Sequence, residues 1–316
     1  MSRKEFDGKS WHIEPGVSLP PGIPAVLVVN SKARRGKEWF PRAKELLDGC
    51  DVDLIDAVAT REPSEVRTRV EAAVKSGVPL VIVGGGDGTF SSIAHVFANS
   101  QSVLGVLPLG TGNAFARDLG IVADLDSAVS VITEGKVQTV DLGLIQDQPF
   151  LNVATVGLTT LIARNLTTDA KRRLGRAVYL FALLRSLSMV KPFQVQVETP
   201  EGNGEFASLQ VVIGNGRFHA GPFPVAPEAS ITEGKLSLYA LKGDRKSQFF
   251  RLAWHLRTGR HVELDDVFHL ETSGGTLVTS PARHVTVDGE VKFETPIRFG
   301  VAPDVLRVMV PQEFSG

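Results

Sequence analysis

Two apolar runs in the first half of the chain each end in a cluster of glycines and are followed by a helix-like segment. The first reads VIVGGGDGTF from Val81 to Phe90, and the second reads VLGVLPLGTGNAFARDLG from Val103 to Gly120. Wholly apolar runs of this length are typical of strands that are buried on both faces, as in parallel sheets. The carboxyl ends of neighbouring parallel strands open onto one crevice, so we expect both glycine turns to border the same crevice.

The segments around these turns alternate between strand and helix patterns. We expect a flexible, polar tail over residues 1–22, because this stretch is rich in glycine and proline, and a fold that starts at Ala25. The expected elements are a strand at Ala25–Asn30, a helix at Lys37–Leu47, a strand around Asp53 and a helix at Ser64–Ser76. Such alternation predicts an α/β domain with a parallel sheet covered by helices on both faces.

After about Val140 the pattern changes to short runs of alternating polar and apolar residues, which predicts a second, mainly antiparallel β domain. The Asp288-Gly289 step is typical of a tight turn between two strands. Two helices are expected, at Asp169–Met189 and at about Arg245–Arg257. The clearest strands are Phe193–Glu198, Ser208–Gly214, Lys235–Leu241, His284–Phe293 and Val305–Pro311. The predicted boundaries are therefore residues 23–140 for the first domain, with 305–316 as a segment that could return to it, and 141–304 for the second.

Length and composition narrow the class of protein. The chain has 316 residues, enough for two domains, and its 34 Lys and Arg residues nearly balance 35 Asp and Glu residues, for a net charge of -1. This balance gives no global attraction for nucleic acid, so none is expected as a partner. The single cysteine, Cys50, favours a reducing compartment, and we expect a cytoplasmic protein. The N-terminus lacks the apolar stretch of a signal peptide, and runs such as Ala177–Leu184 are too short to span a bilayer.

The first glycine turn has the features of a phosphate cradle. Glycines let the backbone approach an anion closely, and the helix that follows offers unpaired N–H groups. The turn is neither a Walker A loop nor a dinucleotide-binding GxGxxG, so binding would depend on backbone amides and the Thr89 hydroxyl. Asp87 would repel phosphate unless a divalent cation or a proton-transfer role accounts for it. The alternative is a tight connection in which Asp87 only caps the helix.

The second glycine turn offers further groups to the same crevice. Gly110, Thr111, Gly112 and Asn113 could pair with phosphate oxygens, and Arg117 could neutralise charge. The alternative for Arg117 and Asp118 is a solvated helix face. The polar, basic loop from Asn30 to Gly36 is expected beside this crevice, and Thr60 ends the second strand.

Taken together and in order, these motifs resemble the diacylglycerol kinase catalytic family of bacterial lipid kinases, which is related to the ceramide and sphingosine kinases. The resemblance runs from Ala25 to Pro311. Its motifs are GGGDGT, PLGTGNAFARDLG, NVATVG at Asn152–Gly157, Gly214-Asn215, APEASITEGKL at Ala226–Leu236, VDGE at Val287–Glu290, and VLRVMVP.

The resemblance implies an ATP-binding α/β domain like that of NAD kinases and diacylglycerol kinases, a C-terminal β-sandwich substrate domain, and a cleft between them. It also implies transfer of the γ-phosphoryl group of ATP, with Mg²⁺, to a lipid hydroxyl, with diacylglycerol as the most frequent acceptor in the family. The lipid would be met by peripheral contact at the inner membrane surface, and a homodimer is left open.

Functional residues are carried over from the family motifs one position at a time. The acids Asp288 and Glu290 match a conserved pair that faces the transferred phosphate, and either Asp87 or Asp288 could be the base. The positions that match the nucleotide site are Asn30, Thr60, Gly85, Gly86, Asp87, Gly88, Thr89, Gly110, Thr111 and Asn113.

The sequence departs from the family pattern at three positions. Ser92 stands where the family has Glu, Ser31 stands where it has Pro, and Glu233 stands where it has the Asp of a DGxL element. The Glu233 change weakens the case for an auxiliary magnesium site, and the metal ligands remain unassigned.

Two alternative functions stay open, and so does the role of one basic segment. An NAD kinase shares GGDGT but needs a downstream Asn-Glu pair that this sequence lacks. A non-catalytic lipid- or nucleotide-binding protein would tolerate Ser92 and Glu233. The basic and apolar segment Asp169–Lys191 could meet anionic headgroups, or could be a core helix with a solvated basic side.

Overall fold

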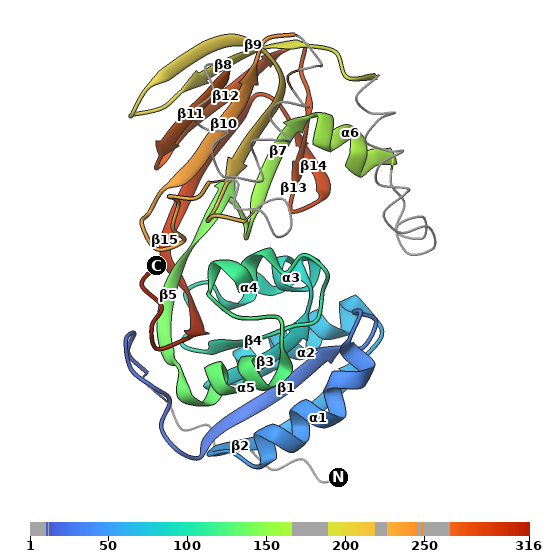
Figure 1. The fold of residues 1–316 in the computed structure, drawn as a ribbon, viewed down its shortest axis with the longest axis vertical. Coiled ribbons are helices and arrows are strands. Elements are labelled where there is room, and N and C mark those ends of the chain that lie inside the picture. Colours follow the sequence, from blue (N-terminus) through green and yellow to red (C-terminus); the bar gives the residue numbers. More distant parts are fainter. Residues whose placement is uncertain (1–10, 12, 166–188, 219–225, 245–247, 249–265) are drawn as a thin grey trace.

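The computed structural model describes residues 11, 13–165, 189–218, 226–244, 248 and 266–316. It contains two domains stacked end to end, with the N-terminal domain at the bottom of Figure 1. The two expected helices at Asp169–Met189 and Arg245–Arg257 fall almost entirely outside the described residues. Among the residues that are described, no helix is both long and apolar enough to cross a membrane.

The N-terminal domain is built on four parallel strands in the order β2 (Val52–Thr60), β1 (Ile23–Asn30), β3 (Leu80–Gly85) and β4 (Val103–Pro108). Every residue of β3 and β4 is buried, as their continuous apolar sequences predict. The parallel α/β sheet expected from the sequence is therefore confirmed. Strand β2 forms the open edge, and its residues are mostly half-buried.

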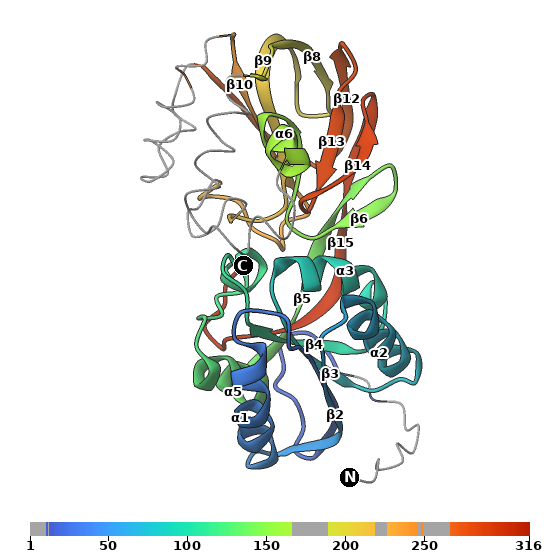
Figure 2. The same ribbon diagram turned by 90° about the vertical axis from the view of Figure 1, so that its right-hand side faces the viewer.

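Helices cover both faces of this sheet. Helices α1 (Gly36–Asp48) and α5 (Leu125–Glu134) lie on one face, and α2 (Pro63–Lys75) and α3 (Asp87–Phe97) lie on the other (Figure 2). A short helix, α4 (Ala114–Asp118), follows β4. Helix α3 begins at Asp87, so this acid lies in its first turn.

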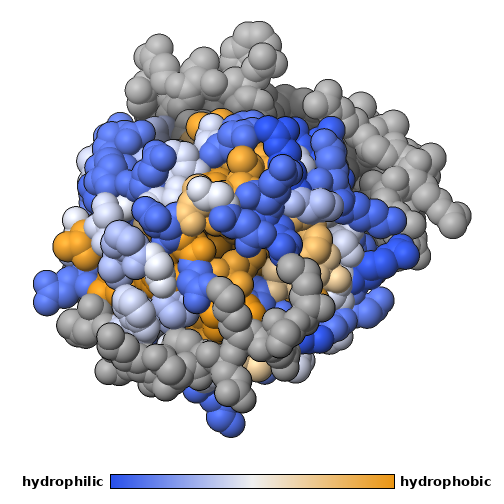
Figure 3. Space-filling view, turned by 90° about the horizontal axis from the view of Figure 1, so that it is seen from below, coloured by the Kyte–Doolittle hydropathy of each residue, from blue (hydrophilic) through white to orange (hydrophobic). Residues whose placement is uncertain are grey.

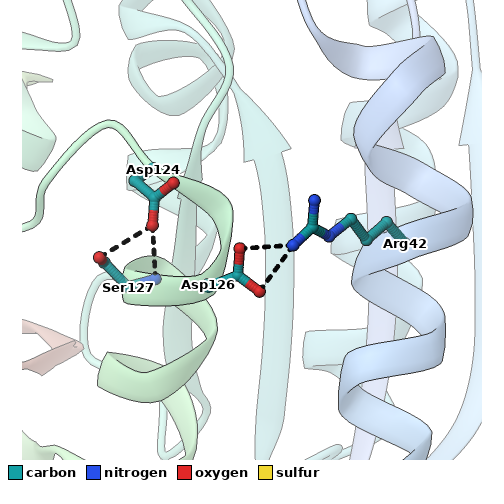
Figure 4. Close-up of polar contacts among 4 residues, drawn as sticks. All are labelled: Arg42, Asp124, Asp126 and Ser127. Carbon is teal, nitrogen blue, oxygen red and sulfur yellow. Dashed lines mark hydrogen bonds and ion pairs between the residues drawn. The ribbon is translucent and has the colours of Figure 1, made fainter.

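One ion pair joins α5 to α1, and a separate capping contact orders the start of α5 (Figure 4). The Asp124 carboxylate caps α5 by accepting hydrogen bonds from the backbone N–H and hydroxyl of Ser127, both at 2.9 Å. Two residues further on, Asp126 forms an ion pair with Arg42 of α1 at 2.7 Å. From below, the end face of this domain presents apolar side chains bordered by hydrophilic ones (Figure 3).

The C-terminal domain is an antiparallel β-sandwich, as predicted. A second hydrophobic core, which includes Phe150, Val195, Leu238 and Phe299, fills it. Its strands are β6 (Gln148–Phe150), β7 (Val153–Gly157), β8 (Phe193–Glu198), β9 (Asn203–Gly214), β10 (Leu236–Lys242), β11 (Val267–Thr272), β12 (Gly274–Ser280), β13 (His284–Val287) and β14 (Glu290–Glu294), and helix α6 (Leu158–Asn165) follows β7.

Two long antiparallel strands, β5 (Lys136–Ile145) and β15 (Ile297–Val310), run through both domains. In β15, Val308 pairs parallel with Leu104 of β4, while residues 297–300 pair with β12. The register shifts midway, between Ala302 and Leu306. The run expected at Val305–Pro311 is therefore the last part of a longer strand that completes the N-terminal sheet.

Candidate active site

The two glycine turns lie against each other at the carboxyl ends of β3 and β4. The Leu109 N–H donates to the Gly85 carbonyl at 2.7 Å. A methyl group on Gly110 would lie 2.8 Å from the Gly86 Cα, so neither turn has room for a side chain at this contact. The helices that follow are joined by the buried rings of Phe90 and Phe115, whose centroids are 6.0 Å apart. The two turns are therefore neighbours at the strand ends, as expected.

The first turn is open on one side. A methyl group on Gly88 would meet no atom within 4 Å, although Gly85 has its space filled by Thr89. The Thr89 hydroxyl accepts a hydrogen bond at 3.1 Å from the Asn30 side-chain amide, which brings the ends of β1 and β3 together. The backbone at Gly88 is thus free for another molecule to approach, beside a hydroxyl and an amide.

Thr60 lies at the end of β2, directly opposite Asn30 in the strand register. Its side chain is buried, donates to the Glu65 carboxylate at 2.5 Å and accepts from the Glu62 N–H at 3.2 Å. The hydroxyl therefore orders the start of α2.

The second turn is closed by its own asparagine. Asn113 has a positive φ of 50° and is 4% exposed. Its side-chain oxygen accepts from the Gly110 N–H at 2.9 Å, and its side-chain nitrogen donates to the Gly110 carbonyl at 3.2 Å. The amide is fully engaged within the turn, whereas Thr111 is exposed.

Asp87 connects the two turns. One carboxylate oxygen accepts from the Phe115 N–H at 3.3 Å, so the acid faces the start of α4. Burial raises the pKa of Asp87, and the nearby charge of Asp288 raises it further; the N–H groups of residues 113–115 oppose this shift. A carboxylate whose charge is poorly compensated is suited to meet a cation or accept a proton.

Asp288 reaches the same region from the C-terminal domain. It lies in the turn between β13 and β14, where Asp288 and Gly289 both have positive φ, at 48° and 88°, as the Asp-Gly step predicts. Its carboxylate accepts four hydrogen bonds, from the Ser91 hydroxyl at 2.6 Å and from the N–H groups of Leu151, Asn152 and Val153 at 2.8, 2.9 and 3.0 Å.

Ser91 therefore joins the domains, and the sequence analysis did not identify it. It lies one helical turn after Asp87 on α3, so both side chains emerge from the same face of that helix. The signal in the sequence is the spacing: Ser91 carries a hydroxyl four residues after Asp87, on the helix that follows the first glycine turn. Glu290, by contrast, begins β14 with an exposed side chain, 3.4 Å from the Lys292 ammonium.

Asp118 is a second contact between the domains. Its carboxylate accepts from the N–H groups of Arg217 and Phe218 at 2.7 and 3.3 Å. Burial raises its pKa to about 7. The suggestion that Asp118 belongs to a solvated helix face is therefore wrong, because the C-terminal domain covers it. Arg117 is exposed and donates to the Gly112 carbonyl at 3.1 Å.

A buried asparagine supports the loop that holds Asp288. The Asn215 side chain donates to the carbonyls of Leu151 and Asp141, both at 3.0 Å, and its N–H donates to the Asn152 carbonyl at 2.8 Å. This explains why the NVATVG and Gly214-Asn215 motifs occur together.

A hollow of about 410 Å³ adjoins the second turn, lined by Asn113, Arg117, Gly120, Ile121, Val122, Ala123 and Phe218.

Comparison with known families agrees with this geometry. Residues 24–145 match the diacylglycerol kinase catalytic domain, and residues 152–310 match the YegS C-terminal NAD kinase beta sandwich-like domain. The chain belongs to the diacylglycerol kinase-like family of lipid kinases. The resemblance seen in the sequence is confirmed, and membership implies a phosphotransferase that uses ATP and a lipid alcohol.

Relatives of this lipid kinase cover most of its length. A diacylglycerol kinase of Mycobacterium tuberculosis (strain H37Rv) is 30% identical over 273 residues, which are 83% of this chain and 86% of the relative. A probable lipid kinase YegS-like of Pseudomonas aeruginosa (strain PAO1) is 32% identical over 254 residues, or 80% and 83%. A crystal structure of a diacylglycerol kinase from Bacillus anthracis str. Sterne shares the fold, with a TM-score of 0.71 and 21% identity over 91% of this chain and 97% of that one.

Two of the three departures from the family pattern make local contacts in this lipid kinase. The Ser31 N–H donates to the Thr60 carbonyl at 2.8 Å, a bond that proline could not make. The Ser92 hydroxyl donates to the Thr89 carbonyl at 2.7 Å. Glu233 is exposed, and the nearby Asp141 carboxylate accepts from the N–H groups of Gly234 and Asp304 at 2.7 and 2.9 Å. Within the described part of the chain, no group of three acids, histidines or cysteines could hold a metal by itself.

Proposed function

We propose that this lipid kinase transfers the γ-phosphoryl group of ATP to the hydroxyl of diacylglycerol, giving phosphatidic acid. The observation that carries the proposal is the open backbone at Gly88, which follows Asp87 on the helix whose Ser91 contacts Asp288. Phosphoryl transfer depends mainly on positioning and on neutralising charge, and this arrangement offers both a close backbone approach and an acid.

ATP phosphates would lie against the first turn. Gly85, Gly86 and Gly88 let the backbone come close, and the first N–H groups of α3 face the same space. Thr89 and Asn30 would supply the side-chain contacts. Gly110 and Asn113 would shape the second turn, whose exposed Thr111 remains available to the nucleotide. Thr60 would act indirectly, because its hydroxyl is held by Glu65.

Asp87 is the better of the two acids for the base. A base needs a free lone pair, and the Asp288 carboxylate already accepts four hydrogen bonds. Asp87 would take the proton of the acceptor hydroxyl as the hydroxyl oxygen bonds to the γ-phosphorus and ADP leaves with the bridging oxygen. Asp288 would position the acceptor side of the cleft, and the exposed Glu290 is a further candidate there.

A divalent metal fits the residues present. Burial and the charge of Asp288 raise the pKa of Asp87, and a cation would relieve this cost. Mg²⁺ is usually held by one or two carboxylates together with substrate phosphates, so a full protein cage is not required. When bound, Mg²⁺ would neutralise charge on the phosphates, with the Asp87 oxygen that does not take the proton as its protein ligand.

The proposal is tested by incubating the purified chain and labelled ATP with diacylglycerol, a sphingoid base or NAD. Label on diacylglycerol alone is expected. Label on the sphingoid base would change the acceptor, and label on NAD would favour the NAD kinase alternative. Label on no acceptor, together with intact nucleotide binding, would favour a non-catalytic binding protein.

A further inference from the structure

A cavity of about 300 Å³ lies in the C-terminal domain, away from the two glycine turns. It opens between the start of α6, the entry to β8 and the outer ends of β13 and β14. Its lining residues are Gly157, Thr160, Leu161, Met189, Val190, Lys191, Phe193, Ala282, Arg283, His284 and Glu294. None of them belongs to the site described above.

The cavity carries more positive than negative charge. Lys191 and Arg283 line it, and within the described segments neither has an acidic partner at ion-pair distance. Among the described residues of the lining, Glu294 is the only acid, and it is the cross-strand neighbour of His284. The cavity therefore suits an anion.

Arg283 is held in place by the protein but keeps unused N–H donors. Its guanidinium lies over the Phe193 ring at 5.1 Å, and one terminal nitrogen donates to the Lys191 carbonyl at 3.4 Å. The Nε atom is buried and has no acceptor among the residues that the structure describes. Buried donors are seldom left without a partner, and arginine commonly binds a phosphate through two parallel N–H groups. A bound anion would give the Arg283 guanidinium a partner for its unused donors.

The rest of the lining is apolar. Val190 and Phe193 are buried, and Leu161 is half-buried. Met189 at the rim is 52% exposed. Cations beside an exposed apolar residue are typical of surfaces that lie at the interface of an anionic membrane. A free phosphate ion would make no use of these apolar groups.

The cavity is separate from the candidate active site. His284 and Asp288 stand at opposite ends of β13, roughly 13 Å apart for four residues of strand. A ligand phosphate at Arg283 would therefore not be the phosphate that is transferred.

We propose that this cavity binds the phosphate of an anionic phospholipid, with Arg283 and Lys191 on the headgroup and Met189 against the acyl region. The bound lipid holds the C-terminal domain at an anionic membrane surface. The proposal does not depend on the identity of the acceptor, because it concerns binding without turnover.

Sedimentation of the full chain with sucrose-loaded vesicles tests this proposal. Wild type is expected to bind vesicles of phosphatidylcholine mixed with phosphatidylglycerol, more strongly than phosphatidylcholine alone, and less at high salt. The double variant Lys191→Ala/Arg283→Ala is expected to lose roughly 25-fold in partition coefficient, or about fivefold for each cation. A matched control, Arg42→Ala/Arg298→Ala, removes two exposed arginines that are paired with Asp126 and Asp147 and should bind like wild type.

A second pair of variants changes only exposed side chains. Met189→Glu places a charge on the exposed rim and should abolish binding to the mixed vesicles. Val278→Glu, at a residue that is 39% exposed on β12, should leave binding unchanged. Thermal unfolding of each variant shows whether the fold is kept.

Several results would overturn the proposal. These are wild type that fails to bind the mixed vesicles, equal losses in the Lys191→Ala/Arg283→Ala and control variants, and normal binding by folded Met189→Glu. Calorimetric binding of inorganic phosphate that depends on Arg283, without vesicle binding, would instead assign the cavity to a free anion.

Discussion

The two glycine turns look alike in sequence but differ in whether their glycines already contact other groups of the protein. In the second turn, the Asn113 side chain satisfies both backbone groups of Gly110, and the glycines are packed against neighbours. In the first turn, Gly88 faces open space and no side chain of the turn fills it. The second turn is thus a support for the first, and glycine-rich sequence alone does not show which turn meets a ligand.

The largest expected effect comes from the acid that joins the turns. Asp87→Asn should lower turnover about 10²- to 10⁴-fold, because a carboxylate base is lost. The midpoint of thermal unfolding should stay the same or rise, since burial disfavours the charged form of Asp87. Steady-state kinetics and thermal melts check both. Near-normal turnover would remove Asp87 as the base.

Alanine at Gly110 and Gly88 compares the turns directly. Gly110→Ala should reduce the free energy of unfolding by about 1–3 kcal/mol, because the new methyl group overlaps Gly86 and Asn113. Gly88→Ala should not destabilise the fold, yet it should raise the KM for ATP by about tenfold, equivalent to about 1.4 kcal/mol. Chemical denaturation and ATP titrations measure these effects. If both variants were equally unstable, the comparison would fail.

The contact between the domains at the first turn can be tested through Ser91. Ser91→Ala removes one of four donors to Asp288 and should cost about 1–2 kcal/mol in unfolding free energy, while Ser91→Thr keeps the hydroxyl and should cost less. A lower kcat in Ser91→Ala, restored in Ser91→Thr, would show that Ser91 positions the acceptor side. Unchanged kinetics in both variants would leave Ser91 with a structural role only.

The contact at the second turn should respond to pH. Asp118 has a folded-state pKa of about 7, above the ordinary value of 3.8. The folded chain therefore binds more protons than the unfolded chain between these values, and its stability falls as pH rises across that window. Asp118→Asn should flatten this part of the profile, which thermal melts at several pH values would detect. A slope identical to that of wild type would show that Asp118 is not its source.

The sequence predicted the parallel sheet and the Asp-Gly turn because both depend on local patterns. The continuous apolar runs of β3 and β4 fit few places in a fold other than a buried sheet. A type I′ turn favours the Asp288-Gly289 pair. The close approach of the two glycine turns followed from the rule for parallel strand ends. These features needed no knowledge of distant contacts.

The parts that the sequence did not predict depend on contacts between distant residues. Ser91 and Asp288 are 197 positions apart, and the burial of Asp118 comes from residues near position 217. The engagement of Asn113 within its own turn was also missed, because an asparagine after glycine is equally compatible with ligand binding and turn formation. Only the packed structure separates these roles.

Strand β15 has a consequence for how the protein is made. The N-terminal sheet takes its last strand from residues near the C-terminus, since Val308 pairs with β4. A ribosome must therefore release almost the entire polypeptide before that sheet is complete. A fragment that stops at residue 145 would leave the edge of β4 bare and prone to association with other chains, so the two halves should not be expressed as independent pieces.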